Sequence, residues 1–417
     1  MDSEIKQRIE MVRRGEVPEG YKKIQRDIIP KDWTIKSLAE VGNNFSYGMN
    51  AAAKAYDGHN KYIRITDIDD NTHIYTGLDL VSPNADLELK YRVQENDILF
   101  ARTGATVGKT YLYNKNDGIL FFAGFLIRVN IPIDNSYYVY EQTLTGRYLN
   151  WIRIMSQRSG QPGINAQEYG TYSFPYCCVK EQQKIAAILT TQDKAIELKE
   201  KRLAEKQRQK KYLMQLLLTG KKRLPGYWGE WNVPKAKEVF QSVTDKNHKG
   251  DLMVLSATQD KGIMPRNEVD IDIKYEVSSL ANYKKVCQGN FVISLRSFQG
   301  GIEYSAYTGL VSPAYTVLSS KKELCDEYYK QYFKSADFIN RLNVAVYGIR
   351  DGKQISFEDF GRLRIPYPPI NEQSAIAQVL STADREISLL RQDIEQEKQK
   401  KKALMQLLLT GIVRVCP

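Results

Sequence analysis

The chain has 417 residues, enough for two or three domains, and 42% of them are hydrophobic, as in a folded globular protein. No apolar run approaches the roughly 20 residues of a membrane-spanning helix, and the charged N-terminus lacks the pattern of a secretion leader, so we expect a cytoplasmic protein without membrane contact. Sixty lysines and arginines against 49 aspartates and glutamates leave a formal net charge of +11, which favours a polyanionic partner.

Cysteine and histidine are too scattered to predict a metal site. The cysteines are odd in number and show no C-x-x-C spacing, so we expect buried thiols and neither a zinc site nor a disulfide framework. They are Cys177, Cys178, Cys287, Cys325 and Cys416. The three histidines are isolated in the sequence, which makes a metal cluster or a Ser-His-Asp arrangement hard to build. No credible catalytic site follows from these residues.

Residues 31 to 175 have the pattern of an α+β domain. Short runs rich in Tyr, Ile, Val and Phe, such as 62–65 and 97–101, are bounded by Gly, Asn, Asp and Pro and predict strands with irregular loops. Helical stretches are fewer, and the best candidate covers 137–155.

One loop of this domain resembles a phosphate-binding loop at first sight. The segment GATVGKT, from Gly104 to Thr110, follows the predicted strand 97–101. A phosphate-binding loop has four residues between its glycines and leads into a helix, whereas Gly104 and Gly108 enclose three and a strand is expected next. The spacing is against nucleotide binding. An NTP-binding enzyme that uses this loop remains an alternative.

The chain repeats itself at an offset of 191 residues. The string LMQLLLTG occurs at 213–220 and again at 404–411, and nineteen of the forty residues that end at each glycine are identical. Upstream the match weakens and then disappears. We therefore expect two unlike variable domains, each followed by a copy of one shared segment.

Both shared segments have the periodicity of long helices that pair with each other. Apolar residues recur every seven positions with a second row between them, and a lysine, Lys210 or Lys401, interrupts the stripe in each copy. Gly220 and Gly411 stand where a C-terminal glycine cap belongs. The residues expected at the seam are Ile185, Leu189, Ile196, Leu203, Leu213, Leu217, Ile376, Leu380, Ile387, Ile394, Leu404 and Leu408.

The second variable domain, with strands expected over 291–295 and 314–318 and a helix over 325–343, predicts the direction of pairing. If its two ends lie close together, as domain termini commonly do, the first long helix ends where the second begins and the helices run antiparallel. A pseudo-two-fold axis would then relate the halves. Forty helical residues at about 1.5 Å each would hold the variable domains about 60 Å apart.

The predicted organisation has four segments. They are a lead-in helix with the first variable domain (1–178), the first long helix (179–222), the second variable domain (223–369) and the second long helix (370–417). Much of the positive charge falls on the first helix, where eleven lysines and arginines from Lys194 to Arg223 accompany three glutamates. A phosphate backbone, an acidic partner or a solvated helix face would each account for it.

Loops of both variable domains carry side chains that can read bases. Arginine matches the two acceptors of guanine, glutamine and asparagine match adenine, and lysine tends to hold phosphate. The candidates are Arg102, Lys109, Arg158, Gln161 and Asn165 in the first domain and Arg296, Gln299, Arg350, Lys353 and Gln354 in the second. Each alone is more often an ordinary exposed residue, but their clustering at corresponding positions favours recognition.

With these features the sequence resembles the specificity subunits of type I restriction-modification systems over nearly its whole length. The segments that resemble the family most strongly are FPYCCVKEQQKIAAIL (174–189), IPYPPINEQSAIAQVL (365–380), LLLTGKKRLPGYWGEW (216–231) and DILFARTGATVGK (97–109). The chain departs from the family at Cys177 and Cys178, where prolines are usual.

The resemblance implies two α/β target recognition domains that each read half of a bipartite, asymmetric double-stranded DNA target, separated by an antiparallel pair of coiled-coil helices. It also implies that the helices dock two modification subunits, which bring S-adenosylmethionine and methylate adenine, and that restriction subunits with ATP-dependent translocase and nuclease activity join them. The chain itself would hold no cofactor and would not be an enzyme. A coiled-coil scaffold that does not read sequence is a further alternative.

Overall fold

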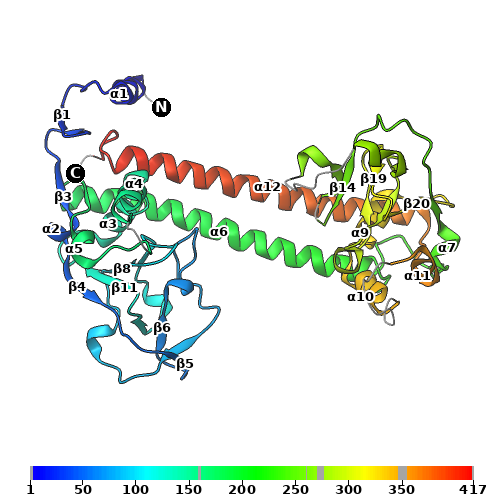
Figure 1. The fold of residues 1–417 in the computed structure, drawn as a ribbon, viewed down its shortest axis with the longest axis horizontal. Coiled ribbons are helices and arrows are strands. Elements are labelled where there is room, and N and C mark those ends of the chain that lie inside the picture. Colours follow the sequence, from blue (N-terminus) through cyan, green and yellow to red (C-terminus); the bar gives the residue numbers. More distant parts are fainter. Residues whose placement is uncertain (1–2, 158–160, 260, 270–276, 346–354, 416–417) are drawn as a thin grey trace. The chain divides into compact units, whose positions relative to one another are not determined.

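The computed structural model describes residues 3–157, 161–259, 261–269, 277–345 and 355–415. The chain divides into two compact units, Met1–Leu198 with Ile394–Pro417, and Lys199–Asp393. Two long helices, α6 (Val179–Leu217) and α12 (Ile370–Leu408), contribute residues to both units (Figure 1). Each unit therefore combines one variable domain with part of each long helix.

The first unit is built on a four-stranded antiparallel sheet in the order β4-β11-β8-β9. Its strands are β4 (Asn43–Tyr47), β11 (Leu126–Asn130), β8 (Asp97–Ala101) and β9 (Thr110–Leu112). All five residues of β8 are buried because alternate side chains enter different cores. Ile98 and Phe100 pack with the helices, whereas Leu99 and Ala101 pack with strands on the other face.

The other described elements of this unit surround the sheet. The helices are α1 (Ser3–Arg14), α2 (Leu38–Val41), α3 (Ser136–Gln142), α4 (Gly146–Met155) and α5 (Ala166–Gly170). The strand pairs are β1 (Tyr21–Ile24) with β2 (Asp27–Pro30), β3 (Thr34–Ser37) with β12 (Ser173–Tyr176), β5 (Ala53–Ala55) with β7 (Val81–Pro83), and β6 (Lys61–Ile63) with β10 (Leu120–Phe122).

The second unit repeats this architecture with a different sequence. Its antiparallel sheet has the order β13-β20-β17-β18, formed by β13 (Phe240–Val243), β20 (Thr316–Ser320), β17 (Phe291–Ile293) and β18 (Glu303–Tyr304). The other strand pairs are β14 (Leu255–Thr258) with β15 (Gly262–Pro265), and β16 (Lys284–Val286) with β19 (Gly309–Val311). The short helices are α7 (Ala236–Val239), α8 (Ser297–Gly300), α9 (Asp326–Tyr332), α10 (Ala336–Ala345) and α11 (Phe357–Arg362).

The predicted α+β class is confirmed, but the two predicted helices 137–155 and 325–343 are each broken into two. Helix α4 begins because the Thr145 side chain accepts a hydrogen bond from the Tyr148 N–H. In the second unit the Ser335 hydroxyl accepts from the Phe338 N–H in the same way, next to the start of α10. Side-chain capping thus starts a new helix inside each predicted one.

The expectation that the cysteines are buried thiols is correct for one of the four described. Cys177 is buried, Cys178 and Cys287 are exposed, and Cys325 is half-buried. Cys178 is exposed because it lies directly before α6, where its carbonyl accepts from the N–H groups of the first turn while its side chain faces solvent.

The long helices run antiparallel in both units. In the second unit, Lys199 pairs with Asp393, Lys206 with Glu386 and Lys210 with Asp384, so residues later in α6 meet residues earlier in α12. In the first unit, Ile185 and Leu189 share a core with Leu408 and Met405. All twelve predicted seam residues are buried or half-buried. None of the described helices is apolar enough over a sufficient length to span a membrane.

Candidate nucleic-acid interface

In the first unit, the loop after β8 lies against the loop before α5. A β-bridge joins Thr103 to Gly163, and the carbonyl of Arg102 accepts a hydrogen bond from the N–H of Ile164 at 2.9 Å. Segments sixty residues apart in the sequence therefore form one edge of the unit. The predicted reading residues that meet at this edge are Arg102, Gln161 and Asn165.

Aromatic side chains accompany Arg102 at this edge. The carbon at the centre of its guanidinium lies 4.9 Å from the ring centroid of Tyr47, a cation–π contact. Tyr47 is 43% exposed and Phe125 is 62% exposed, and the Phe125 carbonyl accepts from the N–H of Arg102 at 3.0 Å. Gln161 is exposed. The edge thus exposes a cation, an amide and two aromatic side chains, which are groups that can contact bases.

Sequence reasoning did not find Tyr47 and Phe125. Tyr47 ends β4 and Phe125 directly precedes β11, and each lies beside a glycine, Gly48 or Gly124. In the sequence, an aromatic residue in such a run predicts a buried strand residue and not a binding residue. An exposed aromatic side chain cannot be told from a buried one by composition alone. The pairing of β4 with β11 places them near Arg102, and this pairing is not visible in the sequence.

Two other predicted reading residues of this unit already have structural partners. Asn165 is the N-cap of α5, and its side chain accepts from the N–H of Glu168 at 2.8 Å. Lys109 is buried, donates to the carbonyl of Ile68 at 2.8 Å and forms an ion pair with Asp70. A phosphate contact by Lys109 would require these bonds to break.

The same contacts bear on nucleotide binding by the loop from Gly104 to Thr110. Thr110 begins strand β9, so no helix N-terminus follows the loop to hold a phosphate. The ammonium group that would reach the phosphates is the one held by Ile68 and Asp70. The geometry therefore gives no support to an NTP-binding enzyme.

In the second unit the corresponding loop follows β17. Arg296 and Gln299 are both exposed, at the N-cap and within the short helix α8. Gln259, from the turn between β14 and β15, donates to the Gln299 side chain at 3.4 Å. Lys334 donates to the Gly300 carbonyl at 2.9 Å and stabilises this turn. The remaining candidates, Arg158, Arg350, Lys353 and Gln354, lie outside the described residues.

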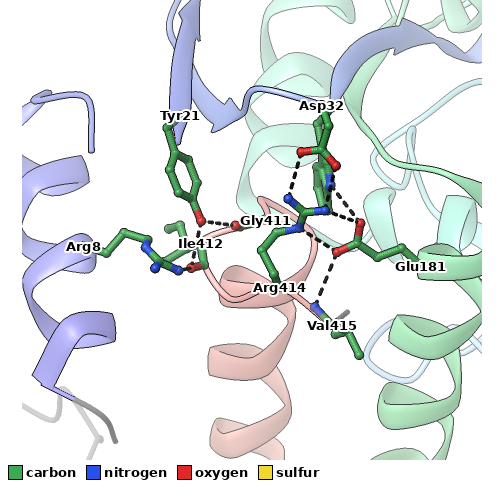
Figure 2. A network of polar contacts seen from close by, with 9 residues as sticks. Arg8, Tyr21, Asp32, Glu181, Gly411, Ile412, Arg414 and Val415 are labelled. Carbon is green, nitrogen blue, oxygen red and sulfur yellow. Dashed lines mark hydrogen bonds and ion pairs between the residues drawn. The ribbon is translucent and has the colours of Figure 1, made fainter. Parts of the chain in front are cut away.

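A buried carboxylate ties the start of α6 to both ends of the chain in the first unit (Figure 2). Glu181 is 1% exposed and accepts two hydrogen bonds from Arg414, at 2.8 and 2.9 Å, and one from the indole N–H of Trp33 at 3.0 Å. Arg414 also binds both carboxylate oxygens of Asp32 at 2.8 Å. Its hydrogen bonds hold the pKa of Asp32 below the ordinary value.

The second unit contains the same joint at the aligned positions. Glu372 is fully buried and accepts two hydrogen bonds of 2.6 Å from Arg223 and one of 2.9 Å from the indole of Trp231. Arg223 and Arg414 are 191 residues apart, as are Glu181 and Glu372. The repeated Glu-Gln pair at the start of each long helix is therefore a structural anchor in each unit.

The lysine that interrupts each apolar stripe pairs with the aspartate that the other helix repeats. Lys210 binds Asp384 at 2.6 Å in the second unit, and Lys401 binds Asp193 at 2.7 Å in the first. Lys401 also binds the buried Glu141 at 2.9 Å. Burial raises the pKa of Glu141 even though Lys401 opposes the shift.

The basic stretch of α6 is partly neutralised within the second unit. Lys199, Lys206 and Lys210 form ion pairs with acids of α12. Other cations of the stretch, including Arg202 and Lys211, are exposed. The interhelical ion pairs show that part of this charge serves helix pairing, and the exposed cations remain for a polyanion or an acidic partner.

Comparison with known proteins places this architecture in a family. Residues 30–207 and 229–399 match the family described as type I restriction modification DNA specificity domain. The putative type I restriction enzyme MjaX specificity subunit of Methanocaldococcus jannaschii is 24% identical over 415 residues, which are 95% of this chain and 97% of that protein.

Two solved structures share the fold. A chain from a study of complex assembly and conformational transition of the type I R-M system has a TM-score of 0.59 and 15% identity, covering 92% of this chain and 99% of that one. The type I restriction-modification system S subunit from M. genitalium has a TM-score of 0.54 and 13% identity, covering 93% and 98%. The family match covers both variable domains and most of both long helices, and the chain belongs to the type I restriction modification DNA specificity domain family.

Proposed function

We propose that the two units each read one half of a split, asymmetric DNA target, as the sequence-specificity subunit of a type I restriction-modification complex. The observation that carries the proposal is the repeated sheet, β4-β11-β8-β9 and β13-β20-β17-β18. The loop after β8 and the loop after β17 expose different side chains. One scaffold used twice with unlike loops fits recognition of two unlike sequences. Direct readout depends on which donors and acceptors the loops present.

The chain contributes recognition and assembly to this complex and no reaction of its own. Two modification subunits would dock on the long helices, bring S-adenosylmethionine and methylate adenine, and restriction subunits would join them to cleave. The exposed cations of α6 and the family's name support this assignment. In the part of the chain that the structure describes, no group of three or more His, Cys, Asp or Glu residues has the geometry to hold a metal ion.

Long-read methylation mapping tests the proposed function. Cells that carry the chain with its modification partner should methylate adenines in a two-part motif whose unread spacer has a fixed length. Cells that carry the partner alone provide the control. A continuous or palindromic motif would contradict reading by two unlike units.

Salt dependence separates this function from that of a scaffold that ignores sequence. Phosphate contacts make affinity fall with salt for any sequence, whereas base contacts give a difference between target and non-target DNA that persists. We expect the purified complex to keep this difference as salt increases. Equal affinity for both duplexes at every salt concentration would favour the scaffold.

A further inference from the structure

We propose that Tyr47 is a positioning residue for base recognition, and that its ring holds the guanidinium of Arg102 so that Arg102 reads a guanine in the half-site of the first unit. This inference rests on the proposed function, because it assigns one base contact to one of the two reading units. Nothing in the sequence motif around Arg102 points to Tyr47, which precedes it by 55 residues.

The strand register places the two side chains on one face of the sheet. Tyr47 of β4 pairs with Ile127 of β11, which pairs with Phe100 of β8. Directly paired residues project to the same side, and so do residues two apart along a strand. Arg102 is two residues beyond Phe100, so it emerges on the Tyr47 side, where the sheet ends. The 4.9 Å cation–π contact follows from this register.

The guanidinium of Arg102 has no other partner that the structure shows. No hydrogen bond or ion pair joins it to any other described residue, although the side chain is half-buried. The arginines at the joints, Arg223 and Arg414, each bind a carboxylate through two nitrogens. A guanidinium held over a ring and free of carboxylate partners keeps its N–H groups available, and two of them can bind two acceptors of one base.

Guanine is the base whose acceptors match the paired N–H groups of a guanidinium. It presents two acceptors, N7 and O6, side by side in the major groove, and a bidentate arginine contact with them is the commonest specific contact to DNA. A phosphate could also bind a guanidinium, but it would carry no sequence information. The two possibilities therefore differ in what a substitution of Arg102 does to sequence preference.

The ring of Tyr47 is itself held in place. Its hydroxyl accepts a hydrogen bond from the N–H of Ala166 at 3.2 Å, at the start of α5. The backbone behind it is tightly packed, because a Cβ on Gly48 would lie 2.1 Å from the carbonyl oxygen of Ala123. Tyr47 therefore stands on a rigid strand end and limits the positions open to Arg102.

In the described part of the second unit, strand β17 does not place an arginine at the matching register position. Ile293 of β17 occupies the position of Phe100, since both face the core formed with the helices. Two residues further on, the register position of Arg102 is taken by Leu295, which is 50% exposed, and the arginine of the corresponding loop, Arg296, comes one residue later. The Arg102–Tyr47 pair lies in the first unit, so its loss should affect the half-site that this unit reads.

The test compares four variants of the full chain, each with its modification partner. By methylation mapping, Arg102→Ala should lose the requirement for one guanine in one half-site and keep the other half-site unchanged. Tyr47→Ala should relax the same position, and Tyr47→Phe, which keeps the ring, should retain it. Arg14→Ala removes an exposed charge from α1 in the same unit and serves as the control, with an unchanged motif.

A duplex in which 7-deazaguanine replaces that guanine adds a chemical test, because it lacks the N7 acceptor. We expect the intact chain to discriminate against it by roughly 5- to 100-fold and Arg102→Ala not to discriminate. Tyr47→Ala should lower the discrimination about 2- to 5-fold. Unchanged sequence preference at the other half-site shows that each variant is folded.

Three outcomes would overturn the inference. Arg102→Ala could weaken binding to every sequence alike and leave the motif intact, which would indicate a phosphate contact. Arg102→Ala could leave both motif and affinity unchanged. Tyr47→Ala could behave like Tyr47→Phe, which would show that the ring does not position the arginine. In each case the intact chain still shows a split motif, whereas its absence in the intact chain would overturn the proposed function itself.

Discussion

Glu181 and Glu372 are buried carboxylates that make equivalent hydrogen bonds in the two units. A carboxylate loses its hydration when it is buried, and this loss is costly unless charged hydrogen bonds replace the water. Each glutamate receives two bonds from one arginine and one from an indole. Arginine suits this position because its fork binds both oxygens at once.

Removal of Arg414 should therefore destabilise the first unit. Arg414→Ala leaves Glu181 with the bonds from Trp33 and from the N–H of Val415 but without its cation. We expect the free energy of unfolding to fall by about 1.5–3 kcal/mol, as for a lost hydrogen bond to a charged group. Denaturant unfolding monitored by tryptophan fluorescence would measure it. The control is Arg14→Ala, an exposed arginine whose loss should change stability by less than about 0.5 kcal/mol. If Arg414→Ala and Arg14→Ala lowered the free energy of unfolding equally, the bonds between Arg414 and Glu181 would contribute no stability.

The lysine pairs allow a prediction about pH. Lys401→Met leaves the buried Glu141 without its cation, so we expect a loss of about 3–5 kcal/mol at pH 7. Burial raises the pKa of Glu141, and a raised carboxyl pKa means that the folded state is favoured at low pH and loses this advantage as pH rises through the folded pKa. The loss in Lys401→Met should therefore shrink between pH 7 and pH 5, as measured by denaturant unfolding.

Two variants control this prediction. Gln331 lies at the position of Glu141 in the second unit and donates to Asp384 at 2.7 Å. Lys210→Met should thus cost under about 1 kcal/mol, because the carboxylate of Asp384 is 43% exposed. Glu141→Gln should remove the recovery at low pH from the Lys401→Met background. An equal loss at all pH values would contradict the role given to Glu141.

Among the elements, the loops after β8 and β17 each have a glycine two residues before the next strand, and this glycine packs against a helical segment. Gly108 and Gly301 have φ of +89° and +79°. A Cβ on Gly108 would meet three side-chain carbons of Ile152 at 2.8 Å, whereas one on Gly301 would lie 1.9 Å from the backbone carbonyl oxygen of Phe333. A side chain can shift on its own, but a backbone carbonyl moves only together with the chain around it.

Alanine should consequently be tolerated less well at Gly301 than at Gly108. Backbone strain costs about 1–3 kcal/mol at each site, and overpacking against Phe333 adds about 1–3 kcal/mol at Gly301. Thermal unfolding of Gly301→Ala and Gly108→Ala would measure the difference. A larger loss for Gly108→Ala would mean that the strand ends are not anchored as described.

These elements also show how far a sequence alone can lead. The seven-residue periodicity predicts both long helices and their seam because each position depends on a short local pattern. The edge that joins Arg102, Gln161 and Tyr47 could not be predicted in full, because its register depends on non-local strand pairing. Lys109 illustrates the limit, since nothing in its sequence neighbourhood shows that its ammonium is buried against Ile68.

At the scale of the whole molecule, the first unit is assembled from both ends of the chain. The hydroxyl of Tyr21 donates to the carbonyl of Gly411 at 2.7 Å, and Arg8 donates to that of Ile412 at 2.9 Å (Figure 2). The second unit is one continuous segment between them. The chain thus passes from one unit to the other twice, once in α6 and once in α12.

These two passages are where the length of the unread spacer would be set under the proposed function. Seven extra residues between Leu198 and Lys199, matched by seven between Asp393 and Ile394, would add about 10 Å of helix at about 1.5 Å per residue. At about 3.4 Å per base pair, methylation mapping should then show a spacer about three base pairs longer with both half-sites unchanged.

The register of the seam provides the control for this insertion. Seven residues make nearly two full turns and keep the apolar stripe on the same side, whereas two residues turn it by about 200°. A two-residue insertion at both positions should therefore disrupt helix pairing and abolish methylation, although it adds less length. If the seven-residue variant methylates the original motif with its spacer unchanged, the helices do not set the distance between the half-sites, and the spacer must be fixed by another part of the complex.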